Sequence, residues 1–246
     1  MIEAGLSVEE VTEFQTAFVI EQTHVNTLVS VLEGLGQSPL NQPEFYFSFE
    51  SPVDFVEQIA VQEQIATDAY LGAAGLISSN QVLTEAASIM VVEARQSSFA
   101  NSVLGSDAFS SPFETGLSLE QVVNLVAPLI VSIPDNTILQ VLGFDVNSFA
   151  LQQTSITAFQ EVSISSTFSF SYSGGEEITP PENVNQLYCA FIEGSQSYFT
   201  EYTPGSGCEI SNQLEVGEVV VVQLTVSESI SVDQLFTAPQ YIQLFP

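Results

Sequence analysis

Three glutamates and the only histidine of the chain lie on helical stripes where apolar side chains are expected. Glu21 and His24 share the inward face of the first expected helix, and Glu63 and Glu93 interrupt the stripes of the next two. A buried carboxylate is costly unless it is paired, hydrogen-bonded or bound to a metal. Helical bundles that hold two iron or manganese ions use inward Glu residues and Glu-x-x-His pairs. Glu21 to His24 fits that pair, so these four residues are the candidate metal ligands.

The second such pair is incomplete, because Glu93 is followed three positions later by Gln96 instead of His. An amide is a poor ligand for iron or manganese. Two interpretations are open. In the first, Glu21, His24, Glu63 and Glu93 bind a transition metal. In the second, which we adopt as the expectation, the site is vestigial, and Glu21, His24, Glu63 and Gln96 form a hydrogen-bonded network in which raised pKa values keep some carboxylates protonated.

The elements that would position these residues are helical in the first half of the chain. Apolar spacing follows a helical period from Ser7 to about Ser132. Helices are predicted to begin after Ser7 and Ser51, after a turn at Ser78–Asn80 and after Ser118, and Ser7 and Ser118 each have a partner for a capping box three positions later. The inward stripe of the first helix is predicted to include Phe14, Phe18 and Leu28.

The second half alternates like strands from about residue 156 to 246. Its strand candidates are residues 168–172, 186–192, 198–202, 218–226 and 241–244. Ser, Thr, Gly and Pro separate them at intervals typical of two packed antiparallel sheets. We therefore predict an α+β protein with a helical bundle over residues 1–135, a linker over 136–155 and an antiparallel β-sandwich over 156–246.

Several motifs occur in an order that resembles a known family. These segments are Glu13–Gln15, Glu21–Val25, Ala69–Ala74, Ala86–Ile89, Glu93–Arg95 and Ser111–Phe113, followed by Tyr188–Phe191, Cys208 and Thr237–Pro239. Together they look like the ferritin-like, desiccation-related and stress-response proteins of fungi and bacteria. The resemblance covers nearly the whole chain and implies a ferritin-like bundle followed by a β-sandwich-like domain, in a protein that is exported and whose activity is poorly defined.

The family's bundle usually begins with one more helix that carries inward Glu residues, placed before the stretch matching Ile2 to Glu13. We therefore expect a reduced bundle with an apolar groove along the absent helix. The short helix after Ser118, a second subunit or another segment would cover this groove, and we favour a second subunit. The protein is accordingly expected to form a homo-oligomer or a larger assembly.

The charge balance excludes several classes of partner. The chain has 30 acidic residues and one basic residue, which gives a net charge of −29. Charged residues are only 13% of the composition, so the imbalance comes from missing bases. Nucleic acids and anionic membranes are excluded as partners because both are bound through clustered Lys and Arg. No membrane span is expected, and no secretory signal is visible at Met1–Gly5.

Two cysteines, Cys189 and Cys208, lie on neighbouring predicted strands. Such an even pair favours one disulfide and therefore an oxidising compartment, with two buried free thiols as the alternative. Nucleophilic catalysis by Cys or Ser is not expected, because the only histidine lies in the helical half beside Glu21. Paired surface acids such as Glu9-Glu10 and Glu176-Glu177 are either solvated or calcium-binding.

The sequence thus predicts a secreted or cell-surface, non-enzymatic structural or stress-protection protein that self-associates, with no required cofactor. A different class of function is a carboxylate-bridged iron or manganese protein, either an oxidase or a metal store, with residual metal-dependent activity at the four candidate ligands. A further class is a module that binds carbohydrate, such as a cell-wall or surface glycan, or a partner protein through exposed aromatic side chains of the sandwich.

Overall fold

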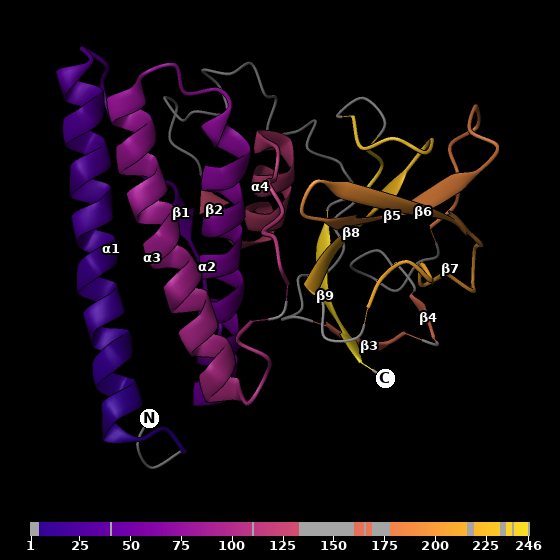
Figure 1. Ribbon diagram of the computed structural model, residues 1–246, viewed down its shortest axis with the longest axis horizontal. Helices are drawn as coiled ribbons and strands as arrows, with labels where there is room; N and C mark the ends of the chain where they lie inside the picture. The colour runs from indigo at the N-terminus through magenta and orange to yellow at the C-terminus, as the bar shows by residue number, and fades with distance from the viewer. Residues whose placement is uncertain are drawn as a thin grey trace.

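The computed structural model describes residues 5–39, 41–109, 111–132, 160–164, 166–168, 178–215, 219–231, 235–237 and 239–245. Over these residues the protein is of the predicted α+β class, with a helical bundle at one end and β-sheets at the other (Figure 1). The predicted linker over residues 136–155 lies outside the described part of the chain.

The helical part contains four α-helices, and the structure confirms their predicted starts. They are α1 (Val8–Gly34), α2 (Pro52–Ala74), α3 (Asn80–Leu104) and α4 (Leu119–Val126), followed by the 3₁₀-helix η2 (Ala127–Leu129). Serine side chains cap all four N-termini, and capping boxes form in α1, α2 and α4. These caps satisfy backbone N–H groups that have no partner in the first helical turn. Pro128 lies within η2, where the α-helix has already ended, because proline cannot continue its hydrogen bonding.

The inward face of α1 is narrower than predicted. Phe14 is buried and its ring contacts Phe55 of α2 and Phe99 of α3, at centroid distances of 5.9 and 5.2 Å. Phe18 and Leu28 do not point into a core, since they are 64% and 38% exposed. The reason is the position of α1 at the edge of the bundle, where one of its faces has no helix beside it (Figure 1).

The C-terminal part is built on a five-stranded sheet of order β3-β9-β8-β5-β6. Its strands are β3 (Gln160–Ser163), β5 (Leu187–Glu193), β6 (Gln196–Tyr202), β8 (Val219–Thr225) and β9 (Gln240–Phe245). A small antiparallel sheet of β4 (Thr167–Phe168) with β7 (Cys208–Glu209) accompanies it, and another, of β1 (Glu44–Phe45) with β2 (Ile130–Ser132), belongs to the helical part. Of the predicted strand over residues 168–172, only Phe168 lies in the described part.

One strand pair departs from the predicted antiparallel arrangement. β3 and β9 are parallel, with Val162 opposite Leu244, whereas the other pairs of the large sheet are antiparallel. A parallel pair needs a long connection between its strands. Along the chain, β3 is the first strand of this sheet and β9 is the last, so the strands between them form that connection.

The predicted disulfide between Cys189 and Cys208 is confirmed, with a Cα–Cα distance of 6.2 Å. Both cysteines are fully buried. The bond joins β5 of the large sheet to β7 of a small sheet, so it ties the two layers of the β-rich part together.

The helices and the large sheet share a hydrophobic cluster besides the separate core that each has. The shared cluster contains Val61 and Ile65 of α2, Leu117, Leu125 of α4, and Ala190, Ile192, Val221 and Tyr241 of the sheet. A loop through Leu117 packs tightly on α2, since a Cβ on Gly72 would collide with the backbone of Leu117. Consequently α2 is buried on two sides, by α3 on one and by α4 and the sheet on the other.

Candidate metal site in the helical bundle

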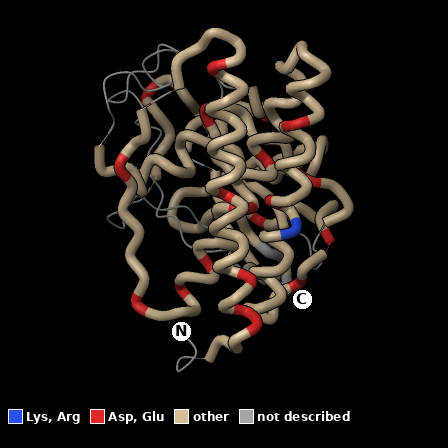
Figure 2. The backbone as a smooth tube through the Cα atoms, turned by 90° about the vertical axis from the view of Figure 1, so that its left-hand side faces the viewer, with Lys and Arg blue, Asp and Glu red and all other residues tan. Residues whose placement is uncertain are grey.

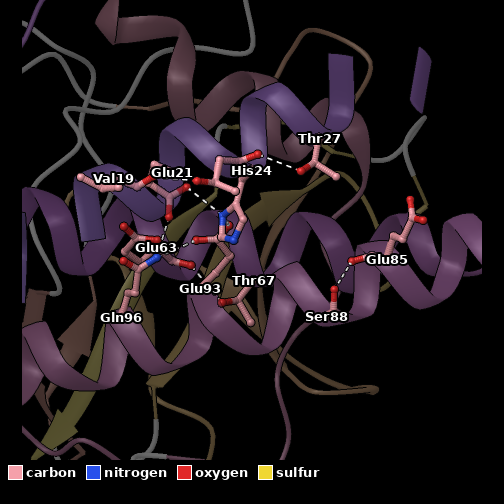
Figure 3. A network of polar contacts seen from close by, with 11 residues as sticks. Val19, Glu21, His24, Thr27, Glu63, Thr67, Glu85, Ser88, Glu93 and Gln96 are labelled. Atoms are coloured by element: carbon pink, nitrogen blue, oxygen red, sulfur yellow. Dashed lines mark hydrogen bonds and ion pairs between the residues drawn. The ribbon is translucent and has the colours of Figure 1, made fainter. Parts of the chain in front are cut away.

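The three long helices bring the candidate ligands to one place in the middle of the bundle. Glu21 and His24 come from α1, Glu63 from α2, and Glu93 and Gln96 from α3 (Figure 3). Glu93 and Glu63 are buried, at 2% and 8% exposure, although α1 lies at the bundle edge. The spacing of three residues in Glu21–His24 and Glu93–Gln96 places both members of each pair on one helical face.

Glu21, His24 and Glu93 form the tightest group. One ligand atom from each of these residues lies within 4.8 Å of the others. His24 Nδ1 is 3.0 Å from Glu93 Oε1 and 3.3 Å from Glu21 Oε2. A hydrogen bond from this imidazole to an ionised carboxylate requires a proton on Nδ1, because such a carboxylate can only accept.

Gln96 takes the position that the Glu-x-x-His pattern gives to a second imidazole, and its amide donates hydrogen bonds to the acids. Its Nε2 donates to Glu21 Oε1 at 2.6 Å and to Glu93 Oε2 at 3.3 Å. The other end of this amide, Oε1, is buried without a hydrogen-bond partner among the described residues. The amide therefore occupies the position between two carboxylates that a bridging cation would take.

Glu63 joins this group through Glu93 instead of through His24. Burial, a hydrogen bond to Glu93 and the negative charges of Glu93 and Glu21 together raise the pKa of Glu63 to about 9, and burial is the largest cause. Glu63 is therefore protonated at neutral pH and donates to Glu93. Burial also raises the pKa of Glu93, while the hydrogen bond from Glu63 and the nearby His24 oppose that rise.

The donor set fits one divalent transition metal and does not fit two. Glu21, His24 and Glu93 could each give one ligand atom to a single ion, in the mixture of imidazole and carboxylate that iron, manganese or zinc accepts. A second ion would have to displace the proton of Glu63 and would need a ligand at position 96, where an amide donates hydrogens instead. Of the predicted ligands, Glu63 is thus the one that stands outside the three-residue group.

A model of the ferritin-like domain matches residues 1–106 of the chain. That stretch contains α1, α2, α3 and all five residues described above. The N-terminal part of this protein is a ferritin-like domain. The predicted ferritin-like bundle is therefore confirmed. The chain has no match among the curated proteins.

A second polar cluster, which the sequence analysis missed, lies between the ferritin-like domain and the sheet. The carboxylate of Asp68 on α2 accepts a hydrogen bond of 2.5 Å from the Tyr241 hydroxyl on β9. Gln64 Nε2 donates to Asp68 at 3.2 Å and to Glu114 at 2.8 Å. A cavity of about 120 Å³ adjoins these residues. The cluster therefore connects α2 to the loop between α3 and α4 and to the last strand, β9.

Burial raises the pKa of Asp68 well above its ordinary value, and the charge of Glu114 adds to this, while hydrogen bonds from Tyr241 and Gln64 oppose it. Burial and the charge of Asp68 likewise raise the pKa of Tyr241. A signal for this cluster was present in the sequence. Val61, Ile65, Asp68 and Gly72 recur at a helical spacing on a second face of α2, which indicates a helix covered on two sides.

Proposed function

We propose that this protein is a non-enzymatic structural or stress-protection protein, exported to a cell surface or matrix, that acts through self-association. In this proposal it is a relative of the desiccation-related proteins whose bundle site has lost its metal chemistry. The observation that carries the proposal is the amide of Gln96, which donates to both Glu21 and Glu93. Together with protonated Glu63, it satisfies the carboxylates by internal hydrogen bonds.

Export is supported by the chemistry of the chain outside the site. A buried disulfide persists in oxidising compartments and is rare where thiols are kept reduced. None of the described helices combines the length and the apolar character needed to cross a bilayer. A net charge of −29 keeps separate chains apart at neutral pH until protons or divalent cations reduce it.

The test of the structural role is the native mass of the protein by light scattering at pH 7, at pH 4 and at pH 7 with calcium. We expect an assembly larger than one chain, and growth of it when acid or calcium lowers the repulsion. A mass of 26.5 kDa under all three conditions would contradict self-association.

One observation favours a second function, which is the binding of a single divalent transition metal by Glu21, His24 and Glu93. These residues hold a ligand atom each within 4.8 Å of one another, and a bound ion would supply Lewis-acid or redox chemistry there. Elemental analysis after dialysis against a chelator and then against manganese, iron or zinc distinguishes the two functions. Near-stoichiometric metal that is lost in the double variant Glu21→Ala/Glu93→Ala would replace the structural proposal by this one.

A further inference from the structure

The outward side of α1 forms an uncharged surface in a strongly acidic protein. Between Glu13 and Glu33, every residue of α1 that is exposed is neutral. We call these residues the outer α1 face: Gln15, Thr16, Phe18, Val19, Gln22, Thr23, Val25, Asn26, Thr27, Leu28 and Ser30. The acidic Glu21 of the same segment turns toward α3, where Gln96 and His24 contact it. α1 stands at the edge of the described part of the molecule, and no other described segment covers this face (Figure 1).

Large apolar side chains lie in the middle of the outer α1 face. Phe18 is 64% exposed, and Val19 and Val25 are 59% exposed each. Hydroxyl groups around them already have acceptors within the helix, such as Thr23 donating to the Val19 carbonyl at 3.0 Å and Thr27 donating to the Thr23 carbonyl at 2.9 Å. Covering these hydroxyls would therefore leave no donor unsatisfied, and covering the apolar groups would be favourable.

The short helix α4 does not cover this surface. It packs on α2, on the side that faces the sheet, whereas α1 lies on the opposite side of the bundle (Figure 1). Of the covers expected from the sequence, the described structure thus excludes the short helix.

The distribution of charge favours a second copy of this chain as the occupant. Two copies carry 29 negative charges each and repel one another wherever acids approach. Acidic positions are spread over the helices and the β-rich part alike, with one basic position among them (Figure 2). A basic partner would be attracted to those acids and would gain nothing from a neutral helix. The outer α1 face instead lets two identical acidic molecules meet without placing acids opposite acids.

We infer that the outer α1 face binds the same face of a second copy, so that two α1 helices pack against each other about a two-fold axis. The contact is isologous, and Phe18 and Val25 of each copy lie near its centre. Glu9 and Glu33, at the two ends of α1, remain at its rim. This inference rests on the proposed self-association and names the surface through which it begins.

The test is sedimentation velocity over a dilution series with the full chain. The double variant Phe18→Glu/Val25→Glu places two acids in the middle of the face, and Asn183→Glu/Gln213→Glu adds the same charge at exposed positions of the β-rich part. We expect wild type and the control to sediment at twice 26.5 kDa, and the face variant to dissociate at least about tenfold more readily. Circular dichroism and the Tm establish that both variants fold.

A covalent test does not depend on weakening the contact. Gln22 lies at the middle of the face, so Gln22→Cys should form a disulfide-linked dimer under mild oxidation faster than the exposed control Gln213→Cys. Equal dimer stability in the two glutamate variants, or equal crosslinking rates in the two cysteine variants, overturns the inference but leaves self-association standing. A wild-type mass of 26.5 kDa at every concentration overturns both, and would leave this face to a partner other than a second copy.

Discussion

At the scale of single residues, the side chain at position 96 determines the hydrogen bonding of the acids at the centre of the ferritin-like domain. The side chain there controls whether the carboxylates of Glu21 and Glu93 meet hydrogen-bond donors or an open coordination position. With Gln96, both acids accept hydrogen bonds from one amide nitrogen, and protonated Glu63 donates a hydrogen bond to Glu93. Hydrogen-bond donors and the proton of Glu63 therefore offset part of the negative charge gathered at this site.

Replacing this amide by imidazole should favour metal binding. In Gln96→His the two carboxylates lose an internal donor and gain a neighbouring nitrogen ligand. We expect cobalt(II) or zinc affinity to rise about tenfold or more, which corresponds to roughly 1.4 kcal/mol. Isothermal titration calorimetry and the visible spectrum of bound cobalt measure this change. Gln81→His, at the exposed start of α3, is the matched control, and an equal gain in both variants would refute the role of position 96.

The proton on Glu63 should make the fold less stable in alkali. Its folded pKa of about 9 lies above the unfolded value of 4.5, so its contribution is fully present below about pH 4.5 and is lost as pH rises through 9. We expect Glu63→Gln, which keeps a neutral side chain, to raise the free energy of unfolding at pH 8 by about 1–3 kcal/mol. Urea unfolding at pH 5 and pH 8 tests this. A variant with the same pH dependence as wild type would show that Glu63 is ionised in the folded protein.

At the scale of elements, α2 is the helix on which the molecule is organised. It faces α3 with Glu63 and Ala60 and faces the sheet with Ile65 and Asp68, so its two sides serve the site and the junction separately. A second polar bridge crosses the same junction, since Gln121 of α4 donates to Gln223 of β8 at 2.9 Å. The ferritin-like domain and the sheet are therefore held by both apolar contacts and buried hydrogen bonds.

Removing one hydroxyl at this junction should be costly. In Tyr241→Phe the buried Asp68 loses a donor, and we expect the free energy of unfolding to fall by about 1–3 kcal/mol. Burial raises the pKa of Asp68, so the contribution of Asp68 to stability is present in acid and declines with rising pH. The hydrogen bond from Tyr241 opposes this rise, so its removal should raise the pKa further. The loss of unfolding free energy in the variant should therefore be larger at pH 8 than at pH 5. Chemical unfolding at both pH values measures it, with the exposed Tyr46→Phe as control. A loss of unfolding free energy no larger than that of the control would show that the Tyr241–Asp68 hydrogen bond does not stabilise the fold.

The disulfide should contribute a further part of the stability of the β-rich region. It closes a loop with a sequence separation of 19, for which the chain-entropy argument gives about 3 kcal/mol. We expect Cys189→Ala/Cys208→Ala to lower the free energy of unfolding by that order. Calorimetry of the variant and of the reduced wild type should agree with each other. An unchanged Tm in both would indicate that packing alone holds β5 and β7 together.

At the scale of the whole molecule, the acidic residues together produce a negative potential around the protein. A charge of −29 disfavours any contact between chains. At physiological ionic strength, salt screens this repulsion over a distance of about 8–10 Å. Self-association therefore depends on a surface that carries little of this charge, and on conditions that reduce the remainder. The outer α1 face meets the first requirement, since its exposed residues are neutral.

Salt should consequently strengthen the assembly. We expect the dissociation constant of the dimer to fall by about tenfold or more between 20 mM and 500 mM sodium chloride, because screening shortens the reach of the repulsion. Sedimentation equilibrium at several salt concentrations measures it. An interface built on ion pairs would weaken over the same range, and that outcome would contradict the neutral contact.

Much of this arrangement could be predicted from residues alone, and the failures share one cause. The starts of the helices follow from local chemistry, as Ser7 with Glu10 and Ser118 with Gln121 satisfy the first turns of their own helices. The gathering of Glu21, His24 and Glu93 follows from helical periodicity. Phe18 was misplaced because periodicity reports which residues share a face and does not report whether another element covers that face.

The sequence by itself determined the α+β class, the pairing of Cys189 with Cys208, the strongly acidic surface and the candidate ligands, because each depends on composition or on spacing along one element. Only the tertiary structure decided that Gln96 donates to two carboxylates, that Asp68 meets Tyr241 across 173 positions, and that β3 lies parallel to β9. These are contacts between segments far apart in the chain. Their geometry is set by how whole elements pack, which no local pattern specifies.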